Sequence, residues 1–403
     1  MFRQIPIGQD IGKKQNSNII DMNSLLFLQF ANSFYLRHDS CDRYWDAFYD
    51  RNRDFGYYRA KHVFEIPKWI AEIAYFTKGY EKKVLYIERS INEAFNEIEK
   101  GVYDYVLFSL MNANQSFIED IVMRCPQQKF IIGGYNEEYL QNLKTRYNNV
   151  IVTETTKEVA DILNVSYSFG TDYTLFKGDT VLPRLTMSYG CLNRCKFCIV
   201  PHGKITDVER RYIEQQVDSF KDLEYKLIYI DDKTFGQAKN WQITSELTER
   251  INNPNFNGFV VQTTSGMVVR NAPDFVKRNV SVVEIGLETY NDDILKAYTK
   301  PSSNKLVDEA VKRANDNGLK LIANIIVGLP EENDETYKRT FDYVMPLLEQ
   351  KKIIGLNPAI YTDYNDNENL GEIDFKQTDK TDIHREWWNK FNETASDILN
   401  KLK

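Results

Sequence analysis

The stretch GCLNRCKFCIVP at residues 190–201 contains three of the five cysteines of this chain. Cys191, Cys195 and Cys198 are spaced C-x3-C-x2-C. Three thiolates this close in sequence can bind three irons of a cubane iron–sulfur cluster and leave the fourth iron open. The stretch therefore predicts an iron–sulfur site with one open iron.

The same cysteines raise two other possibilities, a structural zinc site and a disulfide framework. A structural zinc ion needs a fourth Cys or His to complete its tetrahedron, and His202 is the only local candidate. A disulfide framework cannot use the whole motif, because an odd cluster of three cysteines does not pair off. The remaining cysteines, Cys41 and Cys125, are isolated in the sequence. The cluster is the favoured interpretation, and zinc stays as the alternative.

The composition is that of an ordinary folded protein, with 403 residues, 42% hydrophobic and 27% charged. This length allows two or three domains. The formal net charge of −7 argues against a surface that binds nucleic acid throughout, because phosphate contacts need clustered Lys and Arg. No apolar run approaches the roughly 18–20 residues that span a bilayer, and no secretory signal is expected. A reducing cytoplasm is the expected compartment for an oxygen-sensitive cluster.

Strands and helices alternate in the first half of the chain. Amphipathic helices separate four continuous apolar strands, which are predicted at residues 83–87, 105–110, 129–134 and 149–153. This pattern is typical of a doubly wound, Rossmann-like parallel sheet, whose ligands lie beyond the carboxyl ends of the strands. Residues 1–75 are expected to form an extension that packs on this domain, with a short buried strand at 24–30 and a helix that begins at Pro67.

The same alternation resumes six times in the second half. Its strands are predicted at residues 184–187, 226–230, 258–262, 282–286, 320–326 and 353–360. Six β/α units make a partial (β/α)6 TIM-type barrel rather than the closed barrel of eight. The chain is thus predicted as an α/β protein that consists of an N-terminal extension (1–75), a Rossmann-like domain (76–170), a partial barrel (171–360) and a C-terminal tail with a helix (361–403).

The cysteine spacing, with the aromatic Phe197 just before the last cysteine, resembles the radical S-adenosylmethionine (radical SAM) enzymes. Six β/α units with the cysteine loop after the first strand are also similar to the core of that family. The resemblance implies a [4Fe-4S] cluster on Cys191, Cys195 and Cys198, with the amino and carboxylate groups of SAM on the open iron. Reductive cleavage of SAM then yields a 5'-deoxyadenosyl radical. The implied partners are a reductant such as flavodoxin or ferredoxin and an unidentified substrate.

The resemblance also implies SAM contacts at the ends of the barrel strands. Phe197 is expected beside the adenine, and Asp232 of the pair Asp231-Asp232 is expected to accept hydrogen bonds from the methionyl ammonium. Glu288 looks like the family's ligand for the ribose or the methionyl group, and Gly286 is expected to let the backbone approach closely. The predicted SAM-binding set is Phe197, Asp232, Gln262, Glu288 and Asn324. From the residues alone, an acidic helix N-cap is the alternative for either aspartate.

The Rossmann-like block resembles the cobalamin-binding-like domain that precedes many radical SAM cores. Ser109, Gly133 and Gly134 fall where that family contacts its corrin. The loop after the strand at 83–87, ERSINEAF, has no histidine, so the D-x-H-x-x-G signature of a lower axial ligand is missing. Cobalamin is therefore a candidate cofactor, and a degenerate domain used for packing or substrate capture is the alternative.

The segment CIVPHGK at 198–204 also resembles the methylthiotransferases, which modify tRNA or a ribosomal protein. Those enzymes build a second cluster from three N-terminal cysteines, whereas only Cys41 and Cys125 precede the motif here. Their C-terminal RNA-binding barrel has no room after residue 360.

The favoured function is a radical SAM enzyme. It would transfer methyl groups if it binds cobalamin, and otherwise abstract a substrate hydrogen to start a rearrangement, ring contraction or oxidation. A methylthiotransferase is the second candidate, and a non-catalytic iron–sulfur or SAM-binding protein is the third.

Overall fold

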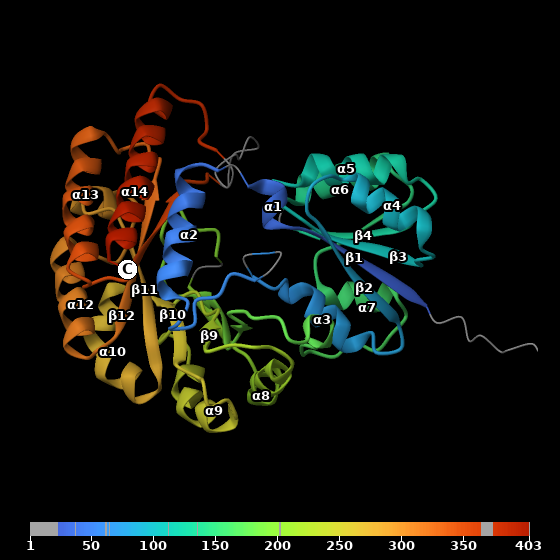
Figure 1. Ribbon diagram of the computed structural model, residues 1–403, viewed down its shortest axis with the longest axis horizontal. Coiled ribbons are helices and arrows are strands. Elements are labelled where there is room, and N and C mark those ends of the chain that lie inside the picture. Colours follow the sequence, from blue (N-terminus) through green and yellow to red (C-terminus); the bar gives the residue numbers. More distant parts are fainter. Residues whose placement is uncertain are drawn as a thin grey trace, which may run out of the picture.

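The computed structural model describes residues 23–402, apart from positions 37, 61, 62, 64, 112, 135, 201, 202 and 364–373. Within this part the chain forms two α/β units that lie side by side (Figure 1). One unit is built on a five-stranded sheet and the other on a six-stranded sheet. The candidate zinc ligand His202 and the first 22 residues of the predicted extension lie outside the described residues.

The N-terminal unit is a parallel sheet with the strand order β2-β1-β3-β4-β5. Its strands are β1 (Ser24–Phe30), β2 (Glu81–Ile87), β3 (Tyr105–Leu110), β4 (Phe130–Gly134) and β5 (Val150–Thr153). The short buried strand predicted at 24–30 is confirmed as β1, but it lies between β2 and β3 and so belongs to the sheet itself rather than to an extension that packs on it. Strand–helix alternation predicted the other four strands, and β1 breaks that alternation because more than one helix separates it from β2.

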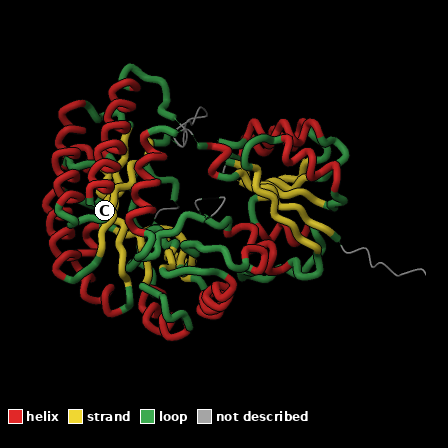
Figure 2. The backbone as a smooth tube through the Cα atoms, in the orientation of Figure 1, coloured by secondary structure: helices red, strands yellow, loops and turns green. Residues whose placement is uncertain are grey.

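Helices cover both faces of this sheet (Figure 2). On one face Leu26 and Leu28 pack with α4 (Asn92–Lys100), α5 (Gln115–Arg124) and α6 (Glu137–Arg146). On the other face Leu25 and Phe27 pack with α3 (Lys68–Phe76) and α7 (Thr156–Ile162). Burial on both faces explains why these strands are continuous apolar runs. The doubly wound prediction is confirmed, and a short helix, α1 (Asn32–Tyr35), follows β1.

The second unit is a parallel sheet with the order β13-β12-β11-β10-β9-β6. The six predicted barrel strands are confirmed as β6 (Arg184–Leu185), β9 (Leu227–Ile230), β10 (Gly258–Thr263), β11 (Val280–Glu288), β12 (Lys320–Val327) and β13 (Gly355–Ile360). Strand β6 is shorter than the predicted 184–187. The side chain of Gln216 bonds both backbone groups of Thr186, at 3.2 and 3.1 Å, in place of a neighbouring strand.

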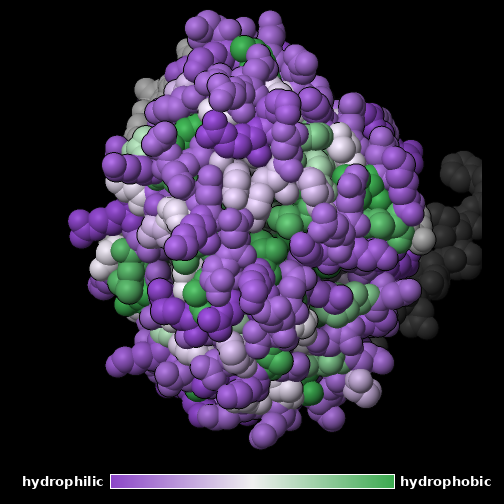
Figure 3. Space-filling model, turned by 90° about the vertical axis from the view of Figure 1, so that its left-hand side faces the viewer, coloured by the Kyte–Doolittle hydropathy of each residue, from purple (hydrophilic) through white to green (hydrophobic). Residues whose placement is uncertain are grey.

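Helices cover the outside of the barrel sheet. They are α8 (Arg210–Ser219), α9 (Thr244–Arg250), α10 (Ser265–Lys277), α11 (Asp292–Ala297), α12 (Asn304–Asp316) and α13 (Asp334–Glu349). Three 3-10 turns complete the connections, at Thr174–Phe176, Phe220–Asp222 and Asn240–Ile243. The outer face over α10, α12 and α13 is mainly hydrophilic (Figure 3). Within the described part, no helix has both the length and the apolar composition to cross a bilayer.

Two helices from opposite ends of the chain close the open edge of the barrel. Helix α2 (Ser40–Asn52) packs against α14 (Thr381–Lys401), so this part of the predicted extension lies on the barrel unit and not on the first domain. The hydroxyl of Tyr44 accepts a hydrogen bond from the Leu356 N–H at 2.7 Å and donates one to the Leu356 carbonyl. Because β13 is an edge strand, one buried tyrosine thus satisfies backbone groups that have no strand partner.

Removing the Tyr44 hydroxyl tests this contact. Tyr44→Phe leaves both backbone groups of Leu356 buried and unsatisfied, and each such group costs about 1–3 kcal/mol. We expect the free energy of unfolding to fall by roughly 1–3 kcal/mol, measured by urea denaturation. Tyr58→Phe, at a half-buried ring, is the matched control and should stay within about 0.5 kcal/mol. An unchanged midpoint for Tyr44→Phe would show that this edge does not depend on the tyrosine.

Candidate functional site

The cysteines lie on a hairpin that the sequence analysis did not predict. Strands β7 (Ser188–Cys191) and β8 (Lys204–Asp207) pair in antiparallel fashion, and Cys195 and Cys198 lie in the loop between them. The loop is tied to the connection after β11, because the Lys196 N–H donates to the Tyr298 carbonyl at 3.0 Å. The hairpin therefore holds the cysteines over the carboxyl ends of the barrel strands, where active sites of barrel folds lie.

All three cysteines line one cavity of about 260 Å³. Of the predicted SAM-binding residues, Phe197, Gln262 and Glu288 line the same cavity. Thr263 and Thr264, which follow Gln262 at the end of β10, line it as well, and the structure adds residues that the prediction missed, namely Asn193, Val200, Lys233, Thr234 and Lys300. Lys300 lies 12 residues after Glu288, so no local spacing marked it as a site residue. The structure thus brings together residues from four strand ends.

The thiols are largely buried, and hydrogen-bonding groups and one cation lie beside them. Cys191 and Cys195 are buried, and the Cys191 sulfur lies 3.2 Å from the Thr234 hydroxyl and accepts the Asn193 N–H at 3.4 Å. Burial raises the pKa of Cys195 to about 11, while the charge of Lys300 opposes that rise. Ligation would remove the thiol proton. Among the described residues, no three His, Cys, Asp or Glu side chains converge on a point that could hold a single metal ion.

An ion pair forms the opposite wall of the cavity. Lys300 Nζ lies 2.5 Å from Glu288 Oε1, and both side chains are about nine-tenths buried, at 9% and 10% exposure. Burial lowers the pKa of Lys300, but Glu288 raises it by more, so the ammonium is stabilised. Lys300 also lies 5.7 Å from the centre of the Phe197 ring. The cavity therefore offers one anion and one cation side by side.

The backbone around Glu288 has an irregular conformation that accommodates the Glu288–Lys300 ion pair. A β-bulge interrupts the pairing of β11 with β12 between Gly286 and Glu288, and Glu288 has a φ of 62°, in the left-handed region. A methyl group on Gly286 would overlap both the Glu288 carboxylate and the Lys300 ammonium. Gly286 was expected to admit close approach of the backbone to a ligand. In the structure it makes room for the ion pair.

The structure does not bring Asp232 or Asn324 into the cavity. The Asp232 carboxylate accepts the backbone N–H groups of Met187 and Ser188 at 3.1 and 2.8 Å, where the chain passes from β6 to β7. Burial raises the pKa of Asp232 to about 6, and these two N–H groups oppose the rise. Asn324 lies in the middle of β12, and its side chain hydrogen-bonds with Glu284. Burial raises the pKa of Glu284. The backbone thus occupies only Oδ1 of Asp232, whereas Asp232 Oδ2 and Asn324 Oδ1 are buried without a hydrogen-bond partner among the described residues.

A second cavity, of about 400 Å³, lies between the two units. Its wall on the N-terminal side contains Gln29 at the end of β1 and Ser109 at the end of β3. The chain leaves β1 towards β2 on one side and later returns to β3 on the other, so the cavity lies at the switch point of the sheet, where ligands of such folds bind. The barrel side contributes Arg184, Asp231 and Lys233. Lys233 lines both cavities.

The predicted corrin contacts do not gather around this second cavity. Ser109 lines it, but Gly133 and Gly134 do not. A side chain on Gly134 would overlap the Leu110 carbonyl of the neighbouring strand, so close strand packing accounts for this glycine. Among the described residues, Ser109 is therefore the one predicted corrin contact that lines this cavity.

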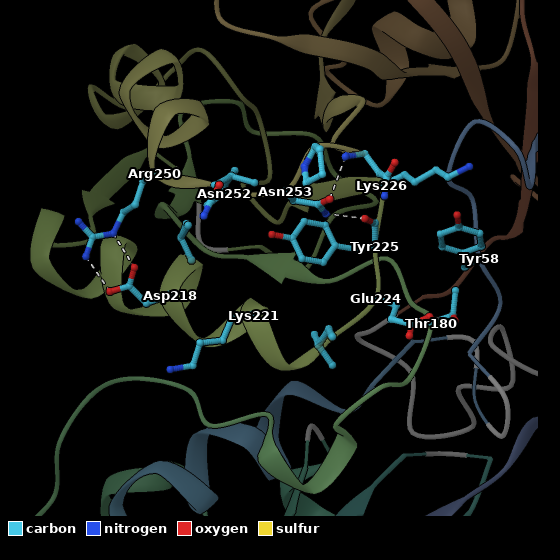
Figure 4. A pocket seen from close by; sticks show the side chains of 15 residues that line it. Tyr58, Thr180, Asp218, Lys221, Glu224, Tyr225, Lys226, Arg250, Asn252 and Asn253 are labelled. Carbon is cyan, nitrogen blue, oxygen red and sulfur yellow. Dashed lines mark hydrogen bonds and ion pairs between the residues drawn. The ribbon is translucent and has the colours of Figure 1, made fainter.

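A larger cavity, of about 860 Å³, lies far from the cysteines (Figure 4). Tyr225 and Lys226, at the amino end of β9, line it, whereas Lys233 follows the carboxyl end of that strand. Arg250 forms two 2.6 Å contacts with Asp218, so these two charges neutralise each other (Figure 4). Because the amino-terminal face of a barrel serves stability rather than chemistry, the smaller cavities are the candidate sites.

Comparisons with known proteins connect this part of the chain with radical SAM enzymes. The radical SAM superfamily matches residues 185–344, which run from β6 into α13. A putative methylthiotransferase of Methanocaldococcus jannaschii is 27% identical over 169 residues, which cover 39% of this chain and 37% of that protein. A threonylcarbamoyladenosine tRNA methylthiotransferase of Aquifex aeolicus is 26% identical over 226 residues, with coverages of 52% and 51%. The chain thus spans about half the length of these relatives or less.

Solved structures resemble the fold of nearly the whole chain. The cobalamin-dependent radical SAM enzyme OxsB, with aqua-cobalamin and SAM bound, has a TM-score of 0.56 at 12% identity and covers 95% of this chain and 56% of its own. The radical SAM methyltransferase TsrM of Kitasatospora setae, with cobalamin and a [4Fe-4S] cluster bound, has a TM-score of 0.55 at 10% identity, with coverages of 84% and 75%. Residues 185–344 of this chain therefore form a radical SAM domain, which follows a Rossmann-like unit.

Proposed function

We propose that this protein is an enzyme that cleaves SAM reductively beside a [4Fe-4S] cluster and uses the resulting radical on a small substrate. The observation that carries the proposal is the single cavity that holds Cys191, Cys195 and Cys198 together with the pair Glu288–Lys300. The chemistry that such a cluster supplies is one electron for the sulfonium of SAM, which splits SAM into methionine and a 5'-deoxyadenosyl radical.

The three cysteines would bind three irons and leave one iron open to the cavity. Cys195 loses its proton on ligation, and the neighbouring Lys300 charge favours the thiolate. The Thr234 hydroxyl and the Asn193 N–H beside Cys191 offer hydrogen bonds to its sulfur. Such bonds adjust the electronic properties of a cluster.

The ion pair suits the methionyl end of SAM, which carries an ammonium and a carboxylate. In the absence of a ligand Glu288 and Lys300 neutralise each other, which limits the cost of burying two charges. A zwitterionic ligand can replace these contacts with charge-assisted ones to its own two ends. Phe197 and Gln262 line the same cavity and would contact the rest of the cofactor.

The cavity between the two units is the proposed place of the substrate. Its volume of about 400 Å³ suits a small molecule. Arg184 bonds Asp231 at 3.2 Å, and Lys68 lies 3.7 Å from Glu72, so the wall is charged but internally paired. Lys233, which lines both cavities, is the residue best placed to contact substrate and SAM at once. These features favour a small polar substrate.

A methylthiotransferase is the second candidate, because the two curated relatives described above are named as such. The second cluster of that class would need three N-terminal cysteines. Cys41 lies in α2 against α14, and Cys125 ends α5 and packs in the core of the other unit. These cysteines therefore lie on different units of the fold.

Loss of one cysteine ligand tests the favoured function. After anaerobic reconstitution with iron and sulfide, we expect about four irons per chain and 5'-deoxyadenosine formation with dithionite. Cys198→Ala should lose most of the iron and all detectable 5'-deoxyadenosine, because the cluster keeps only two thiolates. Cys125→Ala is the matched control and should keep both. Zinc in place of iron, or iron without SAM cleavage, would contradict the proposal, and roughly eight irons would support the methylthiotransferase.

A second test addresses the ion pair. Gly286→Ala should displace Glu288 and Lys300 and weaken SAM binding about tenfold or more, since a charge-assisted contact is worth roughly 1.5–3 kcal/mol. Equilibrium dialysis of the reconstituted protein measures the dissociation constant. Gly79→Ala, where an added methyl group has open space, is the control and should bind SAM normally. If Gly286→Ala fails to fold, Lys300→Gln serves instead, and unchanged SAM affinity in that variant would refute the role of the pair.

A further inference from the structure

Two large apolar side chains are exposed on the cysteine loop. Leu192 is 53% exposed and Ile199 is 55% exposed. Each directly follows a proposed cluster ligand, Cys191 and Cys198. Single exposed hydrophobic residues are common on protein surfaces and need no explanation. Two exposed hydrophobic residues next to the proposed cluster ligands indicate a surface that another molecule can cover.

Three cationic residues lie near Leu192 and Ile199 in the sequence. Arg194, Lys196 and Lys204 are all exposed. Residues 188–206 contain no aspartate or glutamate, although the whole chain has a formal net charge of −7. Within the described residues, neither Arg194 nor Lys196 forms an ion pair. The loop is thus a positively charged surface on an acidic protein, and its charges are available to a partner.

The backbone of this surface is fixed by contacts with the barrel. The Leu192 N–H donates to Gln237 Oε1 at 2.9 Å, and the Thr299 hydroxyl donates to the Arg194 carbonyl at 2.6 Å. The Lys196 N–H is held by the Tyr298 carbonyl at 3.0 Å. A surface that is already ordered loses little conformational entropy when a partner binds.

We propose that Leu192, Ile199, Arg194, Lys196 and Lys204 form the docking surface for the electron donor, an acidic one-electron carrier protein of the flavodoxin or ferredoxin kind. The inference rests on the proposed function, which requires one electron at the cysteines. Each encounter moves one electron: the carrier is oxidised by one electron, and that electron is consumed when the sulfur–C5' bond of SAM breaks into methionine and a 5'-deoxyadenosyl radical.

The physical demands on such a partner match this surface. Electron-transfer encounters are weak and bury less than about 1,200 Å², so one loop is a sufficient contact area. Opposite charges speed association and orient the partner, and salt weakens this effect. The exposed Leu192 and Ile199 supply apolar contact beside the two cysteines through which the electron would enter.

The test compares two reductants on the reconstituted full chain. The double variant Arg194→Glu/Lys196→Glu reverses two charges of the surface. Lys144→Glu/Lys352→Glu makes the same change in net charge at two exposed positions, one on α6 and one in the connection between α13 and β13. Dithionite, which needs no docking, should give the same rate of 5'-deoxyadenosine formation in all proteins. With reduced flavodoxin, the loop variant should be slower by about tenfold or more, and the control should match the unaltered chain.

The outcomes separate the two proposals. No 5'-deoxyadenosine from the unaltered chain with dithionite would refute the proposed function. Normal rates with dithionite, together with an unchanged flavodoxin rate in the loop variant, would overturn the docking surface. If the loop variant loses activity with dithionite, Lys204→Glu on β8 and Leu192→Ser are measured in its place, with the same expectation. A flavodoxin rate that falls with salt in the unaltered chain but not in the charge-reversed variant would support the docking surface.

Discussion

The position of the cysteines depends on one buried carboxylate. Asp232 accepts the N–H groups of Met187 and Ser188 at the point where the chain leaves the barrel sheet for the β7–β8 hairpin. Because β7 ends at Cys191, this contact sets the direction in which the cysteine loop leaves the barrel. Burial raises the pKa of Asp232 to about 6, and hydrogen bonds from Ser188 and Met187 oppose the rise. Further contacts at Leu192, Arg194 and Lys196 fix the rest of the cysteine loop.

The two parallel sheets both contribute residues near their strand ends to the cavity between the units. The cavity between the units lies at the switch point of the N-terminal sheet, and the cysteine cavity lies at the carboxyl ends of the barrel strands. Lys233, directly after Asp232, is the residue that both cavities share. The two cavities are therefore adjacent to each other. A substrate held by the first unit would face SAM held by the second.

The two kinds of relatives reflect different parts of this arrangement. The curated relatives are methylthiotransferases, whereas the solved structures that cover most of the chain are cobalamin-dependent enzymes. The radical SAM match covers residues 185–344, whereas the fold likeness to the solved structures extends over 84–95% of this chain.

The sequence by itself determined the class of the fold, the six barrel strands and the cysteine motif, because strand periodicity and the spacing of ligands are local properties. It also indicated Phe197, Gln262 and Glu288, which lie at strand ends or beside a cysteine. Only the tertiary structure decided where β1 inserts, that α2 closes the barrel edge, and that Lys300 pairs with Glu288 while Asp232 serves the backbone. These features join residues that are distant in sequence. A strand edge or a carboxylate bonds the groups that the folded chain places within hydrogen-bonding distance, and the local sequence does not specify those groups.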